Sequence, residues 1–336
     1  MRVSKLAVAA FAVVAAVAGS APLRAQSGEE IILADPAFSL TFAAGYIASD
    51  LDLWQKHGIK VKTVQLQGIA AINSVIAGSA QFAQASASSF GRASARGQRL
   101  IAIATTIDRP FAQVVLRKDI AQAGGFDAKA PLEKRAAVLR GKSFGVGAIN
   151  ANPHAYLLAV ASRAGIGPDG LRVTALEGNA MWAAFQSKQI DGMSNSPPWP
   201  LKPVVDGASV VIASGPDGDP PNAINFAYNV ILAKPETCEK RQHICVAMGR
   251  VMKEAIAYMH SNPAEVVALL GKKFSNLEPK LIAAAYDEIL KSTPKVPVVT
   301  KQALENADDF NVEAGMMKAD AKLKSYDGLF TDEYVK

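Results

Sequence analysis

The chain has 336 residues, of which 50% are hydrophobic and 20% are charged. This composition supports a sizeable buried core and excludes an intrinsically disordered chain. The length indicates two domains, and ordinary numbers of glycine (25) and proline (18) exclude a collagen-like or low-complexity architecture. The formal charge of +6 comes from basic residues scattered along the chain without a dense cluster, so we expect no nucleic-acid partner.

The N-terminus has the pattern of a secretory signal peptide. Arg2 and Lys5 precede an apolar run at residues 6–18, and small residues then lead to Ala21 and Ala25. The apolar run is shorter than the roughly 17 to 25 residues of a membrane-spanning helix. We expect cleavage after Ala25 or, as the alternative, after Ala21, which leaves a soluble exported protein.

Cys238 and Cys245 are the only cysteines in the sequence. In an exported protein, two cysteines that lie close together predict one disulfide bond. Their separation also equals about two helical turns, so two buried free thiols on one helix are the alternative.

Short strands alternate with helices in the first third of the chain. Residues 31–34 and 61–66 have β-strand patterns and flank a helical pattern at residues 40–57 that ends at Gly58. There follow a helix at 70–77, a strand at 81–85, a helix at 88–96 and a strand at 100–105. Such alternation predicts a mostly parallel sheet with helices on both faces.

The same alternation starts again after residue 130. It comprises helices at 131–139, 153–164 and 180–187 and strands at 143–147, 172–176 and 190–193. After residue 235 the pattern is mostly helical, so this part is expected to pack on the outside of the lobes.

The chain is therefore expected to form two α/β lobes. It crosses between them near residues 107–115 and again at 215–228, a stretch rich in Gly, Pro, Asp and Asn. The expected division is a signal peptide at 1–25, a first lobe of residues 26–112 and 218–336 that includes the C-terminal helices, and a second lobe of residues 113–217.

Catalytic motifs occur only as near matches. Residues 141–145 match the G-x-S-x-G sequence of a nucleophile elbow, which needs a strand before the serine and a helix after it. Here a helix precedes the motif and a strand follows it. The dinucleotide-like Gly145 and Gly147 lack a third glycine, and the P-loop spacing at 165–170 lacks its lysine. The four histidines are far apart in the sequence. We expect no enzymatic activity, no cofactor and no metal.

Small polar loops follow the expected strands. They lie at residues 35–41, 67–68, 86–89, 149–154, 178–179 and 194–199. In an open α/β sheet, ligands bind beyond the carboxyl ends of the strands, where helix N-termini present unpaired N–H groups. Helix capping is the competing explanation for any single serine or asparagine. Six such loops in two lobes predict both walls of one ligand cleft.

Five stretches resemble the substrate-binding proteins of ABC importers, in the nitrate, sulfonate and taurine class that also includes binders of thiamine precursors. They are WQKHGIKV (54–61), NSVIAGSAQFA (73–83), LRGKSFGV (139–146), AGIGPDGL (164–171) and AAFQSKQIDG (183–192). In that family an alanine-rich helix, a glycine, a small or charged residue, an aspartate and an apolar residue recur once in each lobe. Gln81 stands where the family commonly has the aspartate, which we expect to affect a turn and not the ligand.

The resemblance covers residues 30–260 and implies the two-lobed type II periplasmic-binding-protein fold with a ligand cleft between the lobes. It also implies a monomeric periplasmic receptor that closes around a small organic solute, such as a sulfonate, an aromatic acid or a pyrimidine-like ring. The closed receptor would present that solute to the membrane permease of an ABC importer, because the solute contacts both lobes only in the closed state.

Matching of the loops predicts the residues that contact the solute. They are Phe38, Ser39, Gln67, Ser86 and Ser88 in the first lobe and Asn152, His154, Asn179, Asn195 and Trp199 in the second. Serine and asparagine would orient the solute by hydrogen bonds. Phe38 and Trp199 can cover a ring or apolar body, although Trp199 between two prolines is equally suited to packing a rigid turn. His154 can cap a helix, donate to an anionic group or simply pack.

The charge of the solute stays open. These loops contain no arginine or lysine, so an anion would rest on helix N-termini and hydroxyls, and a neutral or zwitterionic solute fits as well. Arg92, Arg96 or Arg109 can still reach the cleft from its rim.

Two other classes of function also stay open. One is an adaptor that reports a bound ligand to a membrane receptor. The other is a biosynthetic enzyme on the same fold, but such relatives carry a cysteine-rich motif and use pyridoxal phosphate, and this sequence lacks that motif.

Overall fold

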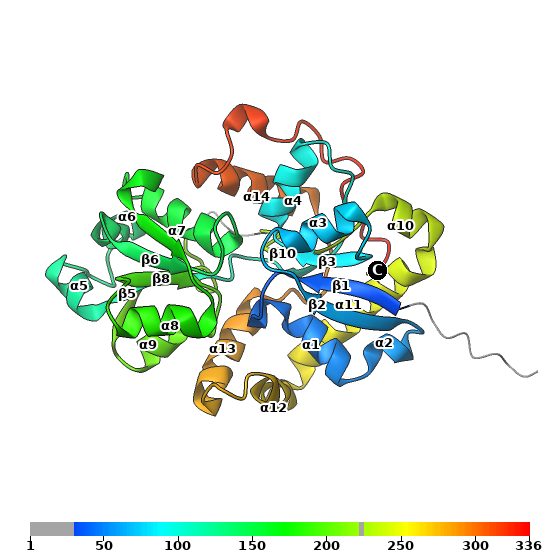
Figure 1. Ribbon diagram of the computed structural model, residues 1–336, viewed down its shortest axis with the longest axis horizontal. Coiled ribbons are helices and arrows are strands. Elements are labelled where there is room, and N and C mark those ends of the chain that lie inside the picture. Colours follow the sequence, from blue (N-terminus) through cyan, green and yellow to red (C-terminus); the bar gives the residue numbers. More distant parts are fainter. Residues whose placement is uncertain (1–29, 222–224) are drawn as a thin grey trace, which may run out of the picture.

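Two five-stranded sheets with flanking helices make up the protein (Figure 1). The computed structural model describes residues 30–221 and 225–336. The expected signal peptide and both of its candidate cleavage sites lie outside the described residues. Within the described ranges, no helix has the length and apolar character needed to cross a membrane.

The first sheet has the strand order β2-β1-β3-β10-β4. Its strands are β1 (Glu30–Asp35), β2 (Lys60–Gln65), β3 (Phe82–Ala85), β4 (Ile101–Ile107) and β10 (Asn229–Ala233). The first four match the expected strands within a few residues. β10 runs antiparallel between β3 and β4 and was not expected, because its five residues are all buried and a short apolar run has no period that marks it as a strand.

The second sheet has the equivalent order β7-β6-β8-β5-β9. Its strands are β5 (Gln113–Arg117), β6 (Ser143–Val146), β7 (Arg172–Ala175), β8 (Gly192–Asn195) and β9 (Ser209–Ser214). The sequence patterns did not predict β5 and β9, and they placed β8 two residues too early. β5 is the antiparallel strand here and occupies the position that β10 has in the first sheet. In each sheet the other four strands run in one direction, so the expected two-lobed α/β fold is confirmed.

Helices cover both faces of the first sheet. They include α3 (Ala70–Ala77), which matches its expected bounds, and α4 (Ala87–Ala95). The single helix expected at residues 40–57 is wrong. It is divided into a 3-10 turn (Leu40–Phe42), α1 (Ala43–Asp50) and α2 (Leu53–Lys56), because Asp52 adopts the left-handed conformation with φ of 52°.

Further helices flank the second sheet. They are α5 (Lys118–Ala123), α6 (Leu132–Ala136), α7 (Asn152–Ser162), α8 (Gly178–Gln186) and α9 (Leu201–Val205), with 3-10 turns at Ala137–Leu139 and Pro168–Gly170. The helix expected at 131–139 therefore changes to a 3-10 turn in its last residues.

The C-terminal part is helical, as expected. It contains α10 (Pro235–Lys240), α11 (Gln242–Ser261), α12 (Pro263–Lys273), α13 (Pro279–Ser292), α14 (Lys301–Glu313) and a 3-10 turn at Ala319–Ala321. Helix α11 packs on α1 and β4, whereas α14 contacts both α4 and α7, and α13 contacts α9 (Figure 1). Helices α13 and α14 therefore connect the helices around the first sheet to those around the second.

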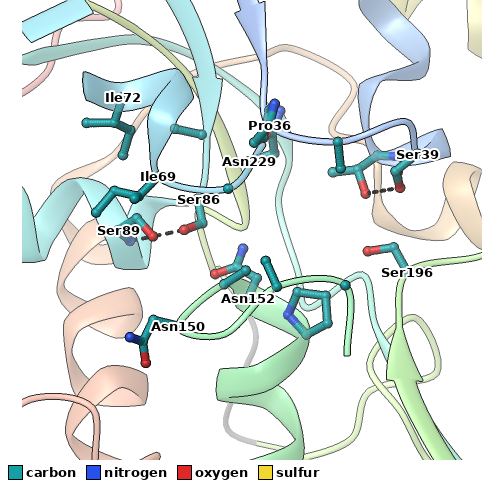
Figure 2. A pocket seen from close by; sticks show the side chains of 18 of the residues that line it. Pro36, Ser39, Ile69, Ile72, Ser86, Ser89, Asn150, Asn152, Ser196 and Asn229 are labelled. Atoms are coloured by element: carbon teal, nitrogen blue, oxygen red, sulfur yellow. Dashed lines mark hydrogen bonds between the residues drawn. The ribbon is translucent and has the colours of Figure 1, made fainter. Parts of the chain in front are cut away.

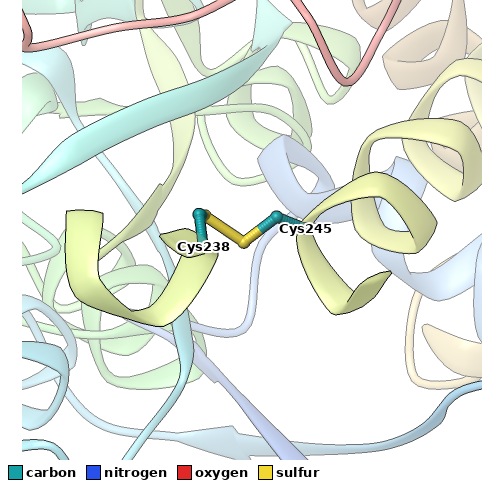
Figure 3. The surroundings of a disulfide bond; sticks show 2 residues. All are labelled: Cys238 and Cys245. Carbon is teal, nitrogen blue, oxygen red and sulfur yellow. A yellow bond between two sulfur atoms is a disulfide. The ribbon is translucent and has the colours of Figure 1, made fainter. Parts of the chain in front are cut away.

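A disulfide bond joins Cys238 in α10 to Cys245 in α11, with 5.6 Å between the two Cα atoms (Figure 3). The cysteines lie on two successive helices and not on one. The pairing agrees with the prediction of a single disulfide.

The chain enters the second sheet after β4 and leaves it after β9. All strands of the second sheet lie within residues 113–217, and all strands of the first sheet lie outside that range. We therefore propose residues 26–112 with 218–336 as the first lobe and residues 113–217 as the second.

Candidate functional site

A cavity of about 230 Å³ lies between the two sheets. Its first wall consists of the loops after β1, β2 and β3, the exposed side of α4 and the start of β10. Its second wall consists of the loops after β6, β7 and β8. In Figure 2, Ser86 and Ser89 lie on the first wall and face Asn150 and Asn152 on the second. The strand-end loops therefore meet because parallel strands end at the same edge of their sheets.

Four of the predicted residues line this cavity, namely Ser39, Ser86, Asn152 and Asn195. Ser39 and Ser86 also cap helices, since the Oγ atom of Ser39 accepts from the Thr41 N–H and that of Ser86 from the Ser89 N–H. Capping uses one lone pair of the Ser86 hydroxyl and leaves its proton available to a solute, whereas Ser39 Oγ also shares a hydrogen bond with Thr41 Oγ1 at 3.0 Å. Their role in binding stays a prediction.

Asn152 is oriented by the main chain. Its Nδ2 atom donates to the carbonyl oxygen of Tyr228 at 2.6 Å, and its buried Oδ1 atom has no hydrogen-bond partner among the described residues. In Asn195 it is the oxygen that bonds to the main chain, because Oδ1 accepts a hydrogen bond from the Ser196 N–H at 2.8 Å. The second wall thus presents a carboxamide oxygen that can accept a hydrogen bond.

Two predicted aromatic residues pack against protein. The Phe38 ring stacks on Phe274 with 4.3 Å between ring centroids, and 39% of Phe38 is exposed. The Trp199 ring lies against Gly178, where a Cβ atom would approach it to 3.0 Å. Neither ring lines the cavity, and the packing alternative describes Trp199 in this structure.

Three predicted polar residues also lie outside the cavity lining. Gln67 and Asn179 are exposed, and Ser88 is fully buried. Their neighbours Gly68 and Ser89 line the cavity instead. A one-residue error of this kind is expected at a helix start, where successive side chains point about 100° apart.

His154 holds the loop after β6. Its Nδ1 atom accepts a hydrogen bond from the Asn150 N–H at 3.0 Å. Burial, followed by the charge of Arg92, lowers the pKa of His154, so the imidazole is neutral and Nδ1 can accept. Asn150 has a φ of 64°, a conformation that asparagine tolerates better than most residues. His154 is thus a positioning residue for this turn.

Arg92 on α4 connects the two walls. Its Nη2 atom donates to Ser89 Oγ at 2.9 Å and to the carbonyl oxygen of Asn150 at 2.6 Å. Burial lowers the pKa of Arg92, but an arginine side chain stays protonated in proteins. Arg96 also lines the cavity, whereas Arg109 does not and lies beside Asp108. Glu177 is the acidic residue among the described lining residues.

Several lining residues were not predicted from the sequence. Besides Ser89 and Asn150, they include Ser196, Tyr228 and Asn229. The Tyr228 hydroxyl lies 3.3 Å from Ser196 Oγ, and burial raises the pKa of Tyr228. Asn229 begins β10 and Tyr228 directly precedes it, so recognition of this strand would have identified both residues.

The described residues contain no group of three histidine, cysteine, aspartate or glutamate side chains suited to hold a metal ion. The cavity instead combines hydroxyls, carboxamides and two arginines with an apolar surface from Phe42, Ile69 and Ile72. Such a set can hold a small solute by hydrogen bonds and apolar contact.

The two-lobed arrangement is that of periplasmic binding proteins. The chain is similar to the aliphatic sulphonate binding protein SsuA from Escherichia coli (TM-score 0.68, 18% identity, 92% of this chain and 99% of that chain). It is also similar to the alkanesulfonate-binding protein SsuA from Xanthomonas axonopodis pv. citri bound to MOPS (0.68, 16%, 86% and 94%). A third is the nitrate-binding protein NrtA from Synechocystis (0.72, 12%, 92% and 87%). At these identities the likeness shows the fold.

The family itself is shown by sequence. Residues 39–266 match the family model described as NMT1/THI5 like, and the chain belongs to this family. No curated protein sequence matches the chain.

Proposed function

We propose that the protein is a periplasmic receptor that closes around a small organic solute and delivers it to the membrane permease of an ABC importer. The observation that carries this proposal is the cavity that both lobes line. A solute held there would contact both walls at once. Because those contacts exist only when the lobes are together, binding would favour the closed arrangement.

The residues of the cavity support a solute with a polar end and an apolar body. Arg92 and Arg96 provide positive charge on the first wall, and Ile69 and Ile72 provide apolar surface beside them. A cavity of about 230 Å³ suits a small molecule. Sulfonates, aromatic acids and pyrimidine-like rings all fit this description.

A thermal-shift screen of residues 26–336 tests the proposal. The panel contains sulfonates, taurine, nitrate, aromatic carboxylates, pyrimidines and flavins. A solute at about 100 times its dissociation constant stabilises the protein by roughly 2.7 kcal/mol, which raises the melting midpoint by several degrees. A chemically coherent group of stabilising solutes is the expected result.

Two asparagine variants make the screen specific to the cavity. Asn152→Ala removes a lining side chain, whereas Asn179→Ala removes an exposed side chain at the start of α8. The first variant is expected to lose the shift and the second to keep it. If no solute raises the midpoint at about millimolar concentration, the proposal of a receptor for these solutes is wrong, and the adaptor that reports a different bound ligand to a membrane receptor becomes the better explanation.

A further inference from the structure

Four buried polar side chains form a continuous hydrogen-bonded chain across the first sheet. They are Asp35 at the end of β1, Gln84 on β3, Asn229 at the start of β10 and Thr106 on β4, and none is more than 4% exposed. These four strands are neighbours in the order β1-β3-β10-β4. Asn229 also lines the cavity, where Figure 2 shows it, so this hydrogen-bonded chain reaches the candidate site at Asn229.

The hydrogen bonds give this chain a direction. Gln84 Nε2 donates to Asp35 Oδ1 at 3.0 Å, and Asn229 Nδ2 donates to Gln84 Oε1 at 3.0 Å. Asn229 Nδ2 also donates to Thr106 Oγ1 at 2.7 Å. An ionised carboxylate only accepts, so Asp35 determines which end of the Gln84 amide faces it. The same constraint then passes to Asn229.

As a result, both N–H groups of the Asn229 carboxamide are used inside the protein. No hydrogen bond among the described residues involves its Oδ1 atom. With Asp35 ionised, Asn229 therefore offers the cavity a hydrogen-bond acceptor, which suits a solute that donates N–H or O–H.

Protonation of Asp35 permits the opposite direction. A protonated carboxyl donates, so Gln84 can turn its Oε1 toward Asp35 and its Nε2 toward Asn229. Asn229 can then turn its Oδ1 toward Gln84 and Thr106, whose hydroxyl rotates to donate. Every buried bond is kept, and Asn229 Nδ2 becomes available to the cavity. Only one proton, on Asp35, distinguishes the two arrangements.

We propose that Asp35, acting through Gln84, determines which end of the Asn229 carboxamide meets the solute, and that Asn229 is thereby a specificity-determining residue of the cavity. This inference rests on the proposed function of a solute receptor. Asp35 is a positioning residue in this scheme, because it acts through Gln84 and not on the solute.

Both arrangements are accessible near neutral pH. Burial raises the pKa of Asp35 to about 7, although the Gln84 hydrogen bond and the charge of Lys273 act in the opposite direction. The titratable groups packed near Asp35 are Tyr46 on α1 and Lys273 on α12, whose Nζ lies 4.6 Å from the Tyr46 ring centroid. The neighbouring strands β2 and β3 face Asp35 with the uncharged Gln65 and Gln84.

A solute-free titration tests the scheme on the exported chain, residues 26–336. Side-chain amide resonances of Gln84 and Asn229 in ¹⁵N-labelled protein, identified from their loss in Gln84→Met and Asn229→Ala, are followed from about pH 5.5 to about pH 8.5. Both are expected to shift with one shared midpoint near the pKa of Asp35. If neither resonance shifts over this pH range, the proposal is overturned.

Two variants separate Asp35 from other carboxyl groups. Asp35→Asn keeps the shape of the side chain but removes its titration, so the Asn229 resonance is expected to become independent of pH. Glu288→Gln is the matched control, because Glu288 on α13 is also a carboxyl group whose pKa burial raises. A pH response that persists in Asp35→Asn contradicts the assignment to Asp35.

A pair of neutral probes extends the test to the cavity. Benzamide carries N–H donors and acetophenone has only an acceptor, and the two are otherwise similar in shape. Raising the pH from about 6 to about 8 is expected to increase the affinity ratio of benzamide to acetophenone by roughly tenfold in the wild type and not in Asp35→Asn. An unchanged ratio contradicts the role of Asn229 in specificity. If no solute of the thermal-shift panel binds, the proposed receptor function is wrong. The titration without solute tests the hydrogen-bonded chain independently of that function.

Discussion

Arg92 on α4 donates from Nη2 to the carbonyl oxygen of Asn150 at 2.6 Å, and this hydrogen bond joins the two walls of the cavity. The acceptor lies in the loop after β6, in a left-handed turn that His154 stabilises through the Asn150 N–H. The Arg92 side chain of the first lobe can therefore make this hydrogen bond only while the Asn150 turn of the second lobe keeps its conformation.

Arg92→Lys is expected to weaken solute binding. A lysine keeps the charge but cannot donate to Ser89, Asn311 and Asn150 from one planar group. Loss of one hydrogen bond to a charged group costs about 1.5 kcal/mol, which corresponds to roughly tenfold in affinity. Calorimetry with the most stabilising solute of the panel measures this change.

Arg172→Lys is the control for that measurement. Arg172 also donates to a carbonyl oxygen, that of Gly141 at 2.7 Å, but both residues belong to the second lobe and lie outside the cavity. Its affinity is expected to equal that of the wild type. Equal losses in both variants would show that Arg92 has no special part in joining the walls.

Asn150 is expected to tolerate glycine better than alanine. Its φ of 64° costs an ordinary L-residue roughly 1–2 kcal/mol, and glycine avoids that cost. Urea denaturation should therefore show Asn150→Ala to be the less stable variant by about 1 kcal/mol. The reverse order would mean that the side chain and not the backbone decides stability here.

Removal of the disulfide is expected to destabilise the folded protein. The bond closes a short loop, with a sequence separation of 7, for which chain entropy accounts for about 2 kcal/mol. The paired substitution Cys238→Ala and Cys245→Ala should lower the melting midpoint, and a reducing agent should lower the wild-type midpoint to the same value. The double variant itself should not respond to the reducing agent.

Asp35 is expected to make the protein less stable as the pH rises toward neutrality. Between the ordinary aspartate pKa of 3.8 and the folded-state pKa of about 7, the folded chain holds a proton that the unfolded chain has released. The contribution of Asp35 to the free energy of unfolding is therefore fully present below pH 3.8 and is lost as the pH rises through about 7. Each unit of difference between the two pKa values corresponds to about 1.4 kcal/mol.

Denaturation midpoints measured at several pH values check this expectation. Asp35→Asn should remove that part of the slope and should be more stable than the wild type above about pH 7. Asp169→Asn, at an exposed position in the second lobe, should leave the slope as it is. An unaltered slope in Asp35→Asn would exclude Asp35 as its source.

Local sequence patterns predicted those helices and strands whose ends are marked by a residue nearby in the sequence. Helix α3 matches its expected bounds because Gly78 ends it with a left-handed cap, φ 81°. The same reasoning failed at residues 40–57, where Asp52 divides the segment although residues 46–57 contain no glycine or proline. Strand β10 was missed because its five residues are all buried, so no alternation marks it.

In the candidate site, too, the residues with a local sequence signal were predicted and those without one were missed. Ser39 and Ser86 were found because a capping serine after a strand is a local signal, and the loop positions were right even where Gln67 and Ser88 stand one residue from the lining. Tyr228 and Asn229 were missed because more than 120 residues separate them in sequence from β4, the strand beside which they lie.

The sequence by itself determined the class of fold, two α/β lobes, and the paired cysteines, because strand and helix periods and residue composition act over short distances. Only the tertiary structure decided which polar groups meet. The Asp35–Gln84–Asn229 chain exists because β10 inserts between β3 and β4, and Arg92 reaches Asn150 because α4 and the loop after β6 face the same cavity. Contacts between strands that are adjacent in space but distant in sequence follow from how the chain packs, and no local pattern records them.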